Sequence, residues 1–204
     1  NGSPMFTGDA GSGESEIRRW IIENDLLETI VQLPNDMFFN TSITTYIWIV
    51  TNKKSSERKG KIQLINGSSF YKQMKKLLNK KRNIIEDSHK DEILQIYKKF
   101  EENKFSQIFD NDSFGYTKIT IEQPAVKNGK EVRDKKGNLK PETKLRDYEK
   151  LQFSEDIDEY FYREVKPHLP NSWIDYDKNI KGYQINFIKY FHQQKISRPS
   201  KDIA

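Results

Sequence analysis

One run of seven residues constrains the fold of this chain most: residues 45–51, TYIWIVT. The run is β-branched and aromatic, does not alternate with polar residues and has the length of a strand, which is typical of a strand buried on both faces of a sheet. Residues 27–33 (LETIVQL) predict a strand before it, and residues 61–65 (KIQLI) predict one after it. The short charged turn between the last two strands predicts an antiparallel hairpin.

Helices are expected before and after these strands. A helix should begin near Glu14, where acidic residues in the first turn suit the helix dipole. Residues 70–78 are also predicted to be helical, and another helix should follow Ser88. The inward-facing residues are expected to be Ile17, Trp20 and Ile21 in the first helix and Ile93, Ile96, Tyr97 and Phe100 in the last. A helix followed by three strands is typical of the closing part of an α/β sheet.

The second half of the chain changes character. Residues 114–121 predict one more strand, but residues 125–150 are highly charged and hold almost no large apolar residues. We interpret residues 1–124 as one domain, residues 125–150 as a polar linker or projecting hairpin, and residues 151–204 as a mainly helical assembly region. The aromatic stretch at residues 183–191 fits either a strand or a short helix.

Composition removes several classes of function. The chain has no cysteine and only three histidines, so thiol nucleophiles, thiolate zinc sites and multi-histidine metal sites are poorly supplied. It has no apolar run long enough to cross a membrane and no signal peptide, so a cytoplasmic location is expected. Lys and Arg exceed Asp and Glu by 35 to 30, which permits nucleic acid as a partner without requiring it. The first residue is not methionine, so we expect a piece of a larger protein.

The most informative candidate site is the loop before the run at residues 45–51. Phe38 and Phe39 are adjacent aromatic residues in this loop, flanked by the polar residues Asn35, Asn40 and Thr41. Aromatic rings in a polar loop can stack on a flat ligand such as a nucleic-acid base. The alternative is that one or both rings simply cover the edge of the sheet, which is the commoner fate of large aromatic residues.

Basic residues gather in three clusters, at residues 53–61, 72–82 and 127–136. The second is the least diluted by acidic residues, so we rank it first as a contact for phosphate groups. Its candidate residues are Lys75, Lys76, Lys80, Lys81 and Arg82. The alternative, that each cluster is an ordinary solvated face, is at least as good for each cluster alone.

Five long segments resemble one known family, at residues 1–54, 61–74 (KIQLINGSSFYKQM), 109–124 (FDNDSFGYTKITIEQP), 145–175 and 182–191 (GYQINFIKYF). Together they resemble the modification (M) subunits of type I restriction–modification systems, which are adenine-specific DNA methyltransferases. The resemblance implies the C-terminal portion of a Rossmann-like sheet with a terminal antiparallel hairpin. It also implies methyl transfer from S-adenosylmethionine to the N6 of adenine in DNA.

The same resemblance assigns roles to this chain. In amino-methyltransferases a loop aromatic stacks on the flipped target base; the matching position is Phe38, with Phe39 as the neighbour that could replace it. The catalytic Asn-Pro-Pro-Phe/Tyr motif and the glycine-rich cofactor motif of the family have no counterpart in these residues. The isolated chain is therefore predicted to be inactive and not to bind S-adenosylmethionine tightly.

The implied partners are DNA, a specificity (S) subunit, a second M subunit and a restriction subunit. Residues 183–191 could supply aromatic anchors for such contacts, or could form a local core instead. A competing hypothesis is that the chain is a non-enzymatic module that binds DNA or another subunit through its basic clusters.

Overall fold

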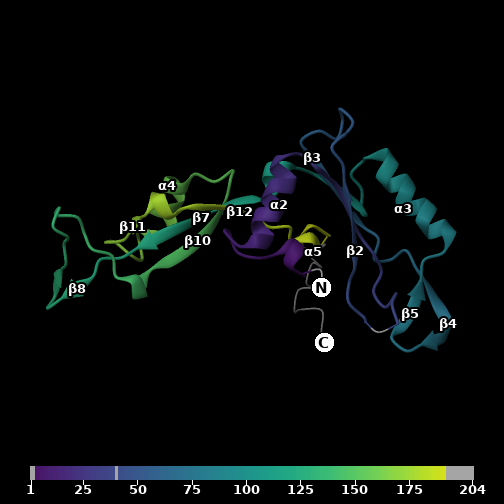
Figure 1. The fold of residues 1–204 in the computed structure, drawn as a ribbon, viewed down its shortest axis with the longest axis horizontal. Coiled ribbons are helices and arrows are strands. Elements are labelled where there is room, and N and C mark those ends of the chain that lie inside the picture. Colours follow the sequence, from purple (N-terminus) through teal and green to yellow (C-terminus); the bar gives the residue numbers. More distant parts are fainter. Residues whose placement is uncertain (1–2, 40, 192–204) are drawn as a thin grey trace, which may run out of the picture. The chain divides into compact units, whose positions relative to one another are not determined.

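The computed structural model describes residues 3–39 and 41–191, and its internal contacts divide them into two units (Figure 1). The first unit comprises residues 3–27, 51–61 and 109–185, and the second comprises residues 28–39, 41–50, 62–108 and 186–191. The chain is of mixed α/β type, with more strands than helices among these residues. The units cut across the predicted domain boundaries at residues 124 and 150, which stay predictions.

The sheet of the second unit has four strands in the order β2–β1–β3–β6. They are β1 (Leu27–Gln32), β2 (Tyr46–Val50), β3 (Lys61–Asn66) and β6 (Ser106–Asp110). β1 and β3 are parallel, with Thr29 opposite Gln63. β2 runs antiparallel to β1. The amide of Leu33 donates to the carbonyl of Thr45, and the amide of Thr51 donates to the carbonyl of Leu26.

This order corrects the predicted hairpin. The strands near residues 27–33, 45–51 and 61–65 are confirmed, but the second and third do not pair with each other, because β1 lies between β2 and β3. β2 is also not buried on both faces: Ile47 is 48% and Val50 is 51% exposed. The physical reason is its place at the end of the strand order, whereas the central strands β1 and β3 are almost completely buried.

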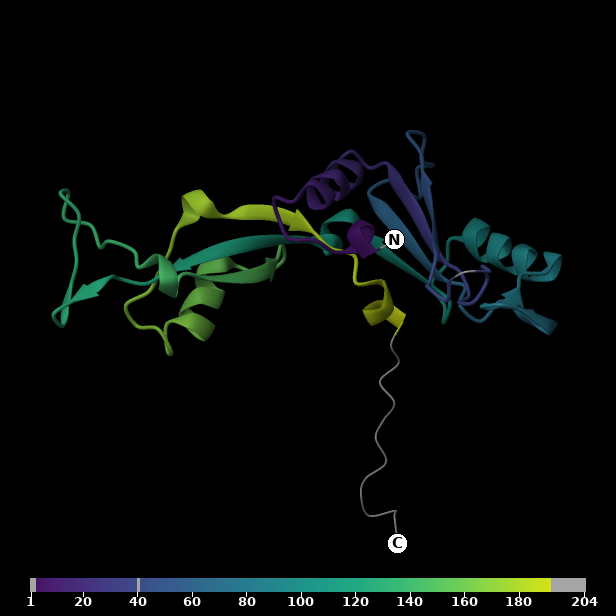
Figure 2. The same ribbon diagram turned by 60° about the horizontal axis from the view of Figure 1, so that its bottom comes forward.

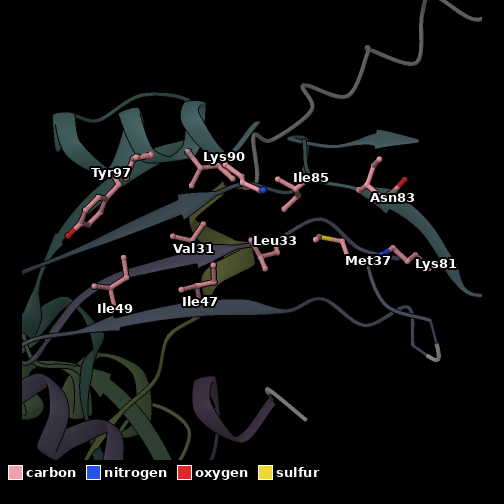
Figure 3. Close-up of a pocket in the computed structure, with 13 residues that line it drawn as sticks. Val31, Leu33, Met37, Ile47, Ile49, Lys81, Asn83, Ile85, Lys90 and Tyr97 are labelled. Carbon is pink, nitrogen blue, oxygen red and sulfur yellow. The ribbon is translucent and has the colours of Figure 1, made fainter. Parts of the chain in front are cut away.

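Helix α3 (Asp87–Lys99) lies over one face of β1 and β2 (Figure 3). The predicted inward residues Ile93, Ile96, Tyr97 and Phe100 are indeed less exposed than their neighbours. None of the residues of α3 is fully buried, however. A polar contact holds the helix to the sheet, since the Tyr97 hydroxyl donates to the Glu28 carboxylate.

The predicted helix at residues 70–78 is wrong; this segment is the first arm of a β-hairpin. β4 (Lys72–Leu78) pairs antiparallel with β5 (Lys81–Ile84), and Leu78 lies opposite Lys81. The two-residue turn contains Asn79 with φ 57°, a left-handed conformation that Asn adopts more readily than most residues. The spacing of apolar residues suggested a helix, but the Asn-centred turn and strand pairing prevail.

In the first unit, Arg18 holds the N-terminal segment and the helix α2 (Gly13–Glu23) together. It is fully buried, and its guanidinium donates to the carbonyls of Tyr183 (2.8 Å), Thr7 (2.7 Å) and Gly8 (3.3 Å). The predicted buried face of α2 is therefore wrong. Ile17 and Trp20 are 54% and 60% exposed, because the helix turns the side carrying Arg18 and Ile22 inward.

A second sheet forms around the long strand β7 (Gly115–Glu122), which is the strand predicted at residues 114–121. β10 (Asp147–Gln152), β11 (Trp173–Ile174) and β12 (Ile180–Tyr183) all pair antiparallel with it; β7 and β12 run side by side in Figures 1 and 2. The hydrophobic core on this second sheet consists of Ile119, Ile121, Leu151, Phe161, Val165 and Ile174. The described part of residues 151–204 is thus not mainly helical.

The helical pieces of this region are short. α4 (Ile157–Tyr160) continues into a π-helical turn at Phe161–Val165, and α5 covers Phe187–Phe191. The strands that pair with β7 contain few apolar residues, so the sequence did not predict them. The remaining elements are α1 (Ser3–Phe6), β8 (Val126–Lys127), β9 (Lys130–Glu131) and three 3-10 turns at Asn111–Phe114, Thr143–Leu145 and Tyr176–Lys178. β8 and β9 form a small antiparallel hairpin within the polar stretch.

The aromatic residues near the C-terminal end take part in local cores. Tyr183 and Phe187 are buried, and the Phe187 ring contacts Tyr46 at 5.2 Å between ring centroids. Tyr183 packs edge-on against Phe153. Neither of these two rings is therefore an exposed anchor for another subunit, which favours the local-core interpretation for them.

A buried carboxylate lies at the end of β7. Glu122 is fully buried and accepts hydrogen bonds from Arg146 Nε and Lys178 Nζ, both at 2.8 Å. Burial by itself raises the pKa of Glu122, but the hydrogen bonds from the two cations outweigh it and hold the pKa below the ordinary 4.5. Because the folded-state pKa is depressed, the ionised group stabilises the fold above about pH 4.5, and this contribution is lost as pH falls through the folded-state pKa.

We expect Glu122→Gln to destabilise the first unit near neutral pH by about 1.5–3 kcal/mol, the range for hydrogen bonds to charged groups. The variant should also lose stability less steeply than the wild type between pH 5 and pH 3. Amide hydrogen exchange along β7 measures both effects locally. An equal pH dependence in the two proteins would contradict the role given to Glu122.

Candidate nucleic-acid interface

The loop that carries Phe38 and Phe39 leaves the carboxyl end of β1. Pro34 is buried at its start, and Asp36 turns the chain with φ 57°. The hydroxyl of Thr44 donates to the Asn35 side chain at 2.8 Å, and the Ile43 amide donates to the hydroxyl of Thr41 at 3.2 Å. Asn35 and Thr41 thus lie within the hydrogen bonds of the loop, while Asn40 lies outside the described residues.

Both aromatic rings of the loop are accessible. Phe38 is 45% and Phe39 is 53% exposed, in a protein whose other phenylalanines include several with almost no exposure. Their exposed surfaces leave room for a flat ligand, and they do not serve as fully packed cover for the sheet. The stacking role itself stays a prediction.

The β4–β5 hairpin is bound to this loop by four hydrogen bonds. The amide of Lys80 donates to the carbonyl of Phe39 (3.1 Å), and the amides of Arg82 and Asn83 donate to that of Asp36 (2.8 and 3.1 Å). The side chain of Asn83 donates to the carbonyl of Asn35 at 2.9 Å. The sequence does not predict this association, because residues 35–39 and 80–83 lie more than 40 positions apart.

A side-chain contact reinforces the backbone bonds. The ammonium of Lys81 lies over the ring of Phe39, 5.0 Å from its centroid. At that distance the positive charge is attracted by the electrons of the ring face. The hairpin thus contacts one face of Phe39, whereas no cation of the described residues lies over the ring of Phe38 in this way.

The hairpin places the second basic cluster beside the two rings. Residues 72–84 contain six basic residues and no acidic residue. Lys75, Lys76, Lys80 and Arg82 are exposed, Lys81 is half-buried, and Lys72 pairs with Glu86 at 2.7 Å. The structure therefore brings together the two candidate groups that the sequence supplied separately, the loop aromatics and the phosphate-binding cluster.

The other two basic clusters differ in how available their side chains are. In the first, Lys54 is buried and bonds the Asp25 carboxylate (2.6 Å) and the carbonyl of Lys61 (2.8 Å). Arg58 is buried as well. In the third, Arg133 bonds the carbonyl of Gly137 and lies 3.8 Å from Glu131. Lys127, Lys130, Lys135 and Lys136 of the third cluster are exposed, so the ranking of the second cluster above the third stays a prediction.

A mainly apolar groove of about 720 Å³ opens between α3 and the sheet, next to the loop (Figure 3). Val31, Ile47 and Ile49 form its sheet side, and Met37 and Asn83 form the end nearest the loop. Its cationic lining residues are Lys81 and Lys90, and it has no carboxylate among its described lining residues. Such a groove suits an apolar group and disfavours a cation.

Histidine and metal chemistry find no support in the described part of the chain. The Nδ1 of His89 accepts a hydrogen bond from the Glu86 amide at 3.2 Å, which caps α3, so this histidine has a structural role. Across residues 3–39 and 41–191 no group of three or more His, Asp or Glu side chains is placed to hold a metal ion. Within the same ranges, no helix combines the length and apolar character that crossing a membrane requires.

Comparison with known proteins places these features in a family. A family model described as N-6 DNA Methylase matches residues 4–144, more than two thirds of the chain. The chain belongs to this family. The matched residues include the Phe38 loop, the β4–β5 hairpin and the apolar groove.

Two curated proteins support the resemblance seen in the sequence. The MjaIX methylase subunit of a type I restriction enzyme from Methanocaldococcus jannaschii is 33% identical over 59% of this chain and 20% of its own length. The MjaVIII methylase subunit of the same organism is 30% identical over 85% of this chain and 26% of its own length. The chain thus spans about a fifth to a quarter of these relatives. The resemblance to type I modification subunits is confirmed.

A solved structure is also similar. The methyltransferase subunit of a type I restriction–modification system from Streptococcus thermophilus is 27% identical and covers 55% of this chain and 22% of its own. The TM-score is 0.46.

The hydrogen bonds between loop and hairpin lead to a prediction about Asn83. Asn83→Ala removes the bond to the Asn35 carbonyl, and a net loss of about 0.5–1.5 kcal/mol is expected for one such bond. The amides of Lys80 and Arg82 should then exchange hydrogen about two- to ten-fold faster. Lys104→Ala, on an exposed residue outside the loop and hairpin, is the control. Unchanged exchange in Asn83→Ala would show that its side chain does not hold the loop.

Proposed function

We propose that this chain is part of the modification subunit of a type I restriction–modification system and that the complete subunit methylates adenine N6 in DNA. In this proposal the chain supplies the end of the catalytic sheet and the loop that receives the flipped base. The observation that carries it is the pair of exposed rings, Phe38 and Phe39, held beside a hairpin that has six basic and no acidic residues.

The chemistry explains why such a surface is needed. The N6 amino group of adenine is paired and stacked within the duplex, so the nucleotide must rotate out before its amino group can react. An exposed aromatic ring can receive the extruded base, and stacking of this kind is worth roughly 1–3 kcal/mol per base. Lysine and arginine side chains of the adjacent hairpin would neutralise the phosphates on either side.

The position of the loop also fits a binding site in an open sheet. The loop follows β1, and the segment leading to the hairpin follows β3, which is parallel to β1. Both therefore leave from carboxyl ends of strands, where ligands bind in open α/β sheets. We infer that the sheet is the terminal part of a Rossmann-like sheet, and that other parts of the subunit cover the faces of β2, whose Ile47 and Val50 are half exposed.

S-adenosylmethionine is the methyl donor in this proposal, and the groove next to the loop does not suit it. The donor carries a sulfonium and an ammonium group, which call for carboxylate or carbonyl partners. The groove next to the loop offers lysines and apolar side chains instead. We infer that other parts of the complete subunit hold the donor, together with the catalytic Asn-Pro-Pro-Phe/Tyr motif of the family.

Several apolar surfaces of the chain suit contacts with further protein. Ile17 and Trp20 are exposed on α2, and Ile47 and Val50 are exposed on β2. We propose that the rest of the modification subunit covers these surfaces and that specificity, second modification and restriction subunits assemble with the complete protein. The competing function, a DNA- or subunit-binding module without catalysis, is supported by the same basic hairpin.

Phe38→Ala in the complete modification subunit, assembled with its specificity subunit, should lower the methylation rate about ten-fold or more, as expected for the loss of base stacking. Binding of S-adenosylmethionine, measured by calorimetry, should not change. Equal losses of both would indicate collapse of the sheet. If the wild-type complex binds DNA but transfers no methyl group to adenine, the module without catalysis is the correct function.

Lys75→Met and Lys76→Met together should weaken DNA binding by the same complex and reduce its dependence on salt. Each lost phosphate contact lowers the slope of log K against log salt by about 0.9 on duplex DNA, so the double variant should lose about 1.8. Gel-shift titrations at several salt concentrations measure the slope. An unchanged slope would mean that the hairpin faces away from the phosphates.

A further inference from the structure

We infer that Phe38 and Phe39 have different tasks: Phe38 receives the base, whereas Phe39 and Lys81 form a clamp that fixes the base-receiving loop to the DNA-binding hairpin. The inference rests on the proposed function and adds a positioning residue pair to it. Its consequence is that contact of the hairpin with the DNA backbone and reception of the flipped base are energetically coupled.

The first observation is the difference between the two rings. Phe39 has the Lys81 ammonium over one face at 5.0 Å, and its own carbonyl accepts the amide of Lys80 at 3.1 Å. Both its side chain and its backbone are thus attached to the hairpin. The Phe38 backbone instead pairs with Thr41 across the loop. Both residues are about half exposed, Phe38 at 45% and Phe39 at 53%, so they differ in their attachment to the hairpin rather than in their exposure. Phe38 is the one whose ring has no cation of the described part of the hairpin over it.

The second observation is that the hairpin, and not the loop, positions the side chain of Lys81. Lys81 is the first residue of β5 and follows the Asn79–Lys80 turn, so its side chain is placed by the hairpin rather than by the loop. Its neighbours Lys80 and Arg82 are exposed and donate their backbone amides to the loop. A displacement of the hairpin by a DNA backbone would therefore be transmitted directly to Phe39, and from there to the adjacent Phe38.

The third observation is that the hairpin holds the loop along most of its first half. Four hydrogen bonds reach the carbonyls of residues 35, 36 and 39 from residues 80–83 of the hairpin. The Phe39–Lys81 contact is a side-chain supplement to these bonds. A cation over an aromatic ring at an exposed site shifts an equilibrium such as attachment of the loop to the hairpin by about two- to five-fold.

The test is a double-variant cycle in the complete modification subunit with its specificity subunit and cofactor. Phe39→Leu keeps an apolar side chain but removes the ring, and Lys81→Met keeps the length but removes the charge. The target site is first mapped by sequencing the adenines that the wild-type complex methylates. A duplex carrying 2-aminopurine at the target position then reports the equilibrium of base extrusion by its fluorescence.

Phe39→Leu and Lys81→Met should each lower that equilibrium about two- to five-fold, and the double variant should lose no more than the larger single loss. Phe38→Leu should lower it more, about five-fold or above. Lys81→Met should cost less in the Phe38→Leu background than in the wild type, because the clamp acts on the base through Phe38. Lys104→Met is the matched control, because Lys104 also lies over a ring, that of Phe105 at 4.7 Å, outside the loop and hairpin.

Amide hydrogen exchange of the same variants without DNA provides a readout that does not depend on catalysis. Exchange at Lys80 and Arg82 should quicken about two- to five-fold in Phe39→Leu and in Lys81→Met, but not in Phe38→Leu or in the control. If the effects of Phe39→Leu and Lys81→Met simply multiply, or if Phe39→Leu lowers extrusion as much as Phe38→Leu without altering exchange, the clamp is refuted. A wild-type complex that never extrudes the base would refute the proposed function, while exchange would still decide the clamp.

Discussion

The parallel pairing of β1 with β3 is the constraint on which the candidate site depends. Two parallel neighbours end at the same edge of a sheet, so the chain segments that follow them emerge together. The segment after β1 is the Phe38 loop, and the segment after β3 leads into the β4–β5 hairpin. Four hydrogen bonds can join residues 35–39 to residues 80–83 only because both segments start from that edge.

The sequence predicted the strands of this sheet but not their order. Each apolar run at residues 27–33, 45–51 and 61–65 became a strand, because burial and β-propensity are local signals. The pairing of β1 with β3 is a long-range choice that no single run specifies. The aromatic loop and the basic cluster were likewise identified as candidates from local sequence. Their position side by side depends on long-range pairing, which nothing in the sequence indicated.

Two errors have a common physical origin. The residues expected to be buried on α2, Ile17 and Trp20, are exposed, and the strand expected to be covered on both faces, β2, is half exposed. An apolar pattern indicates a surface that favours burial, and the described residues do not cover that surface on α2 or on β2. In α2 the inward side is set by Arg18, a charged residue whose carbonyl partners lie in the nearby N-terminal segment (Thr7 and Gly8) and in the distant strand β12 (Tyr183). Helical spacing of apolar residues gives no indication of such a contact.

The central claim is that the Phe38 loop receives the target adenine. Photo-crosslinking tests it most directly, with the complete complex bound to a duplex that carries a photoreactive base analogue at the target position. Peptide mapping by mass spectrometry then identifies the residue attached to the base. We predict attachment within residues 33–45, at Phe38. Efficient crosslinking that occurs entirely outside this loop would contradict the account.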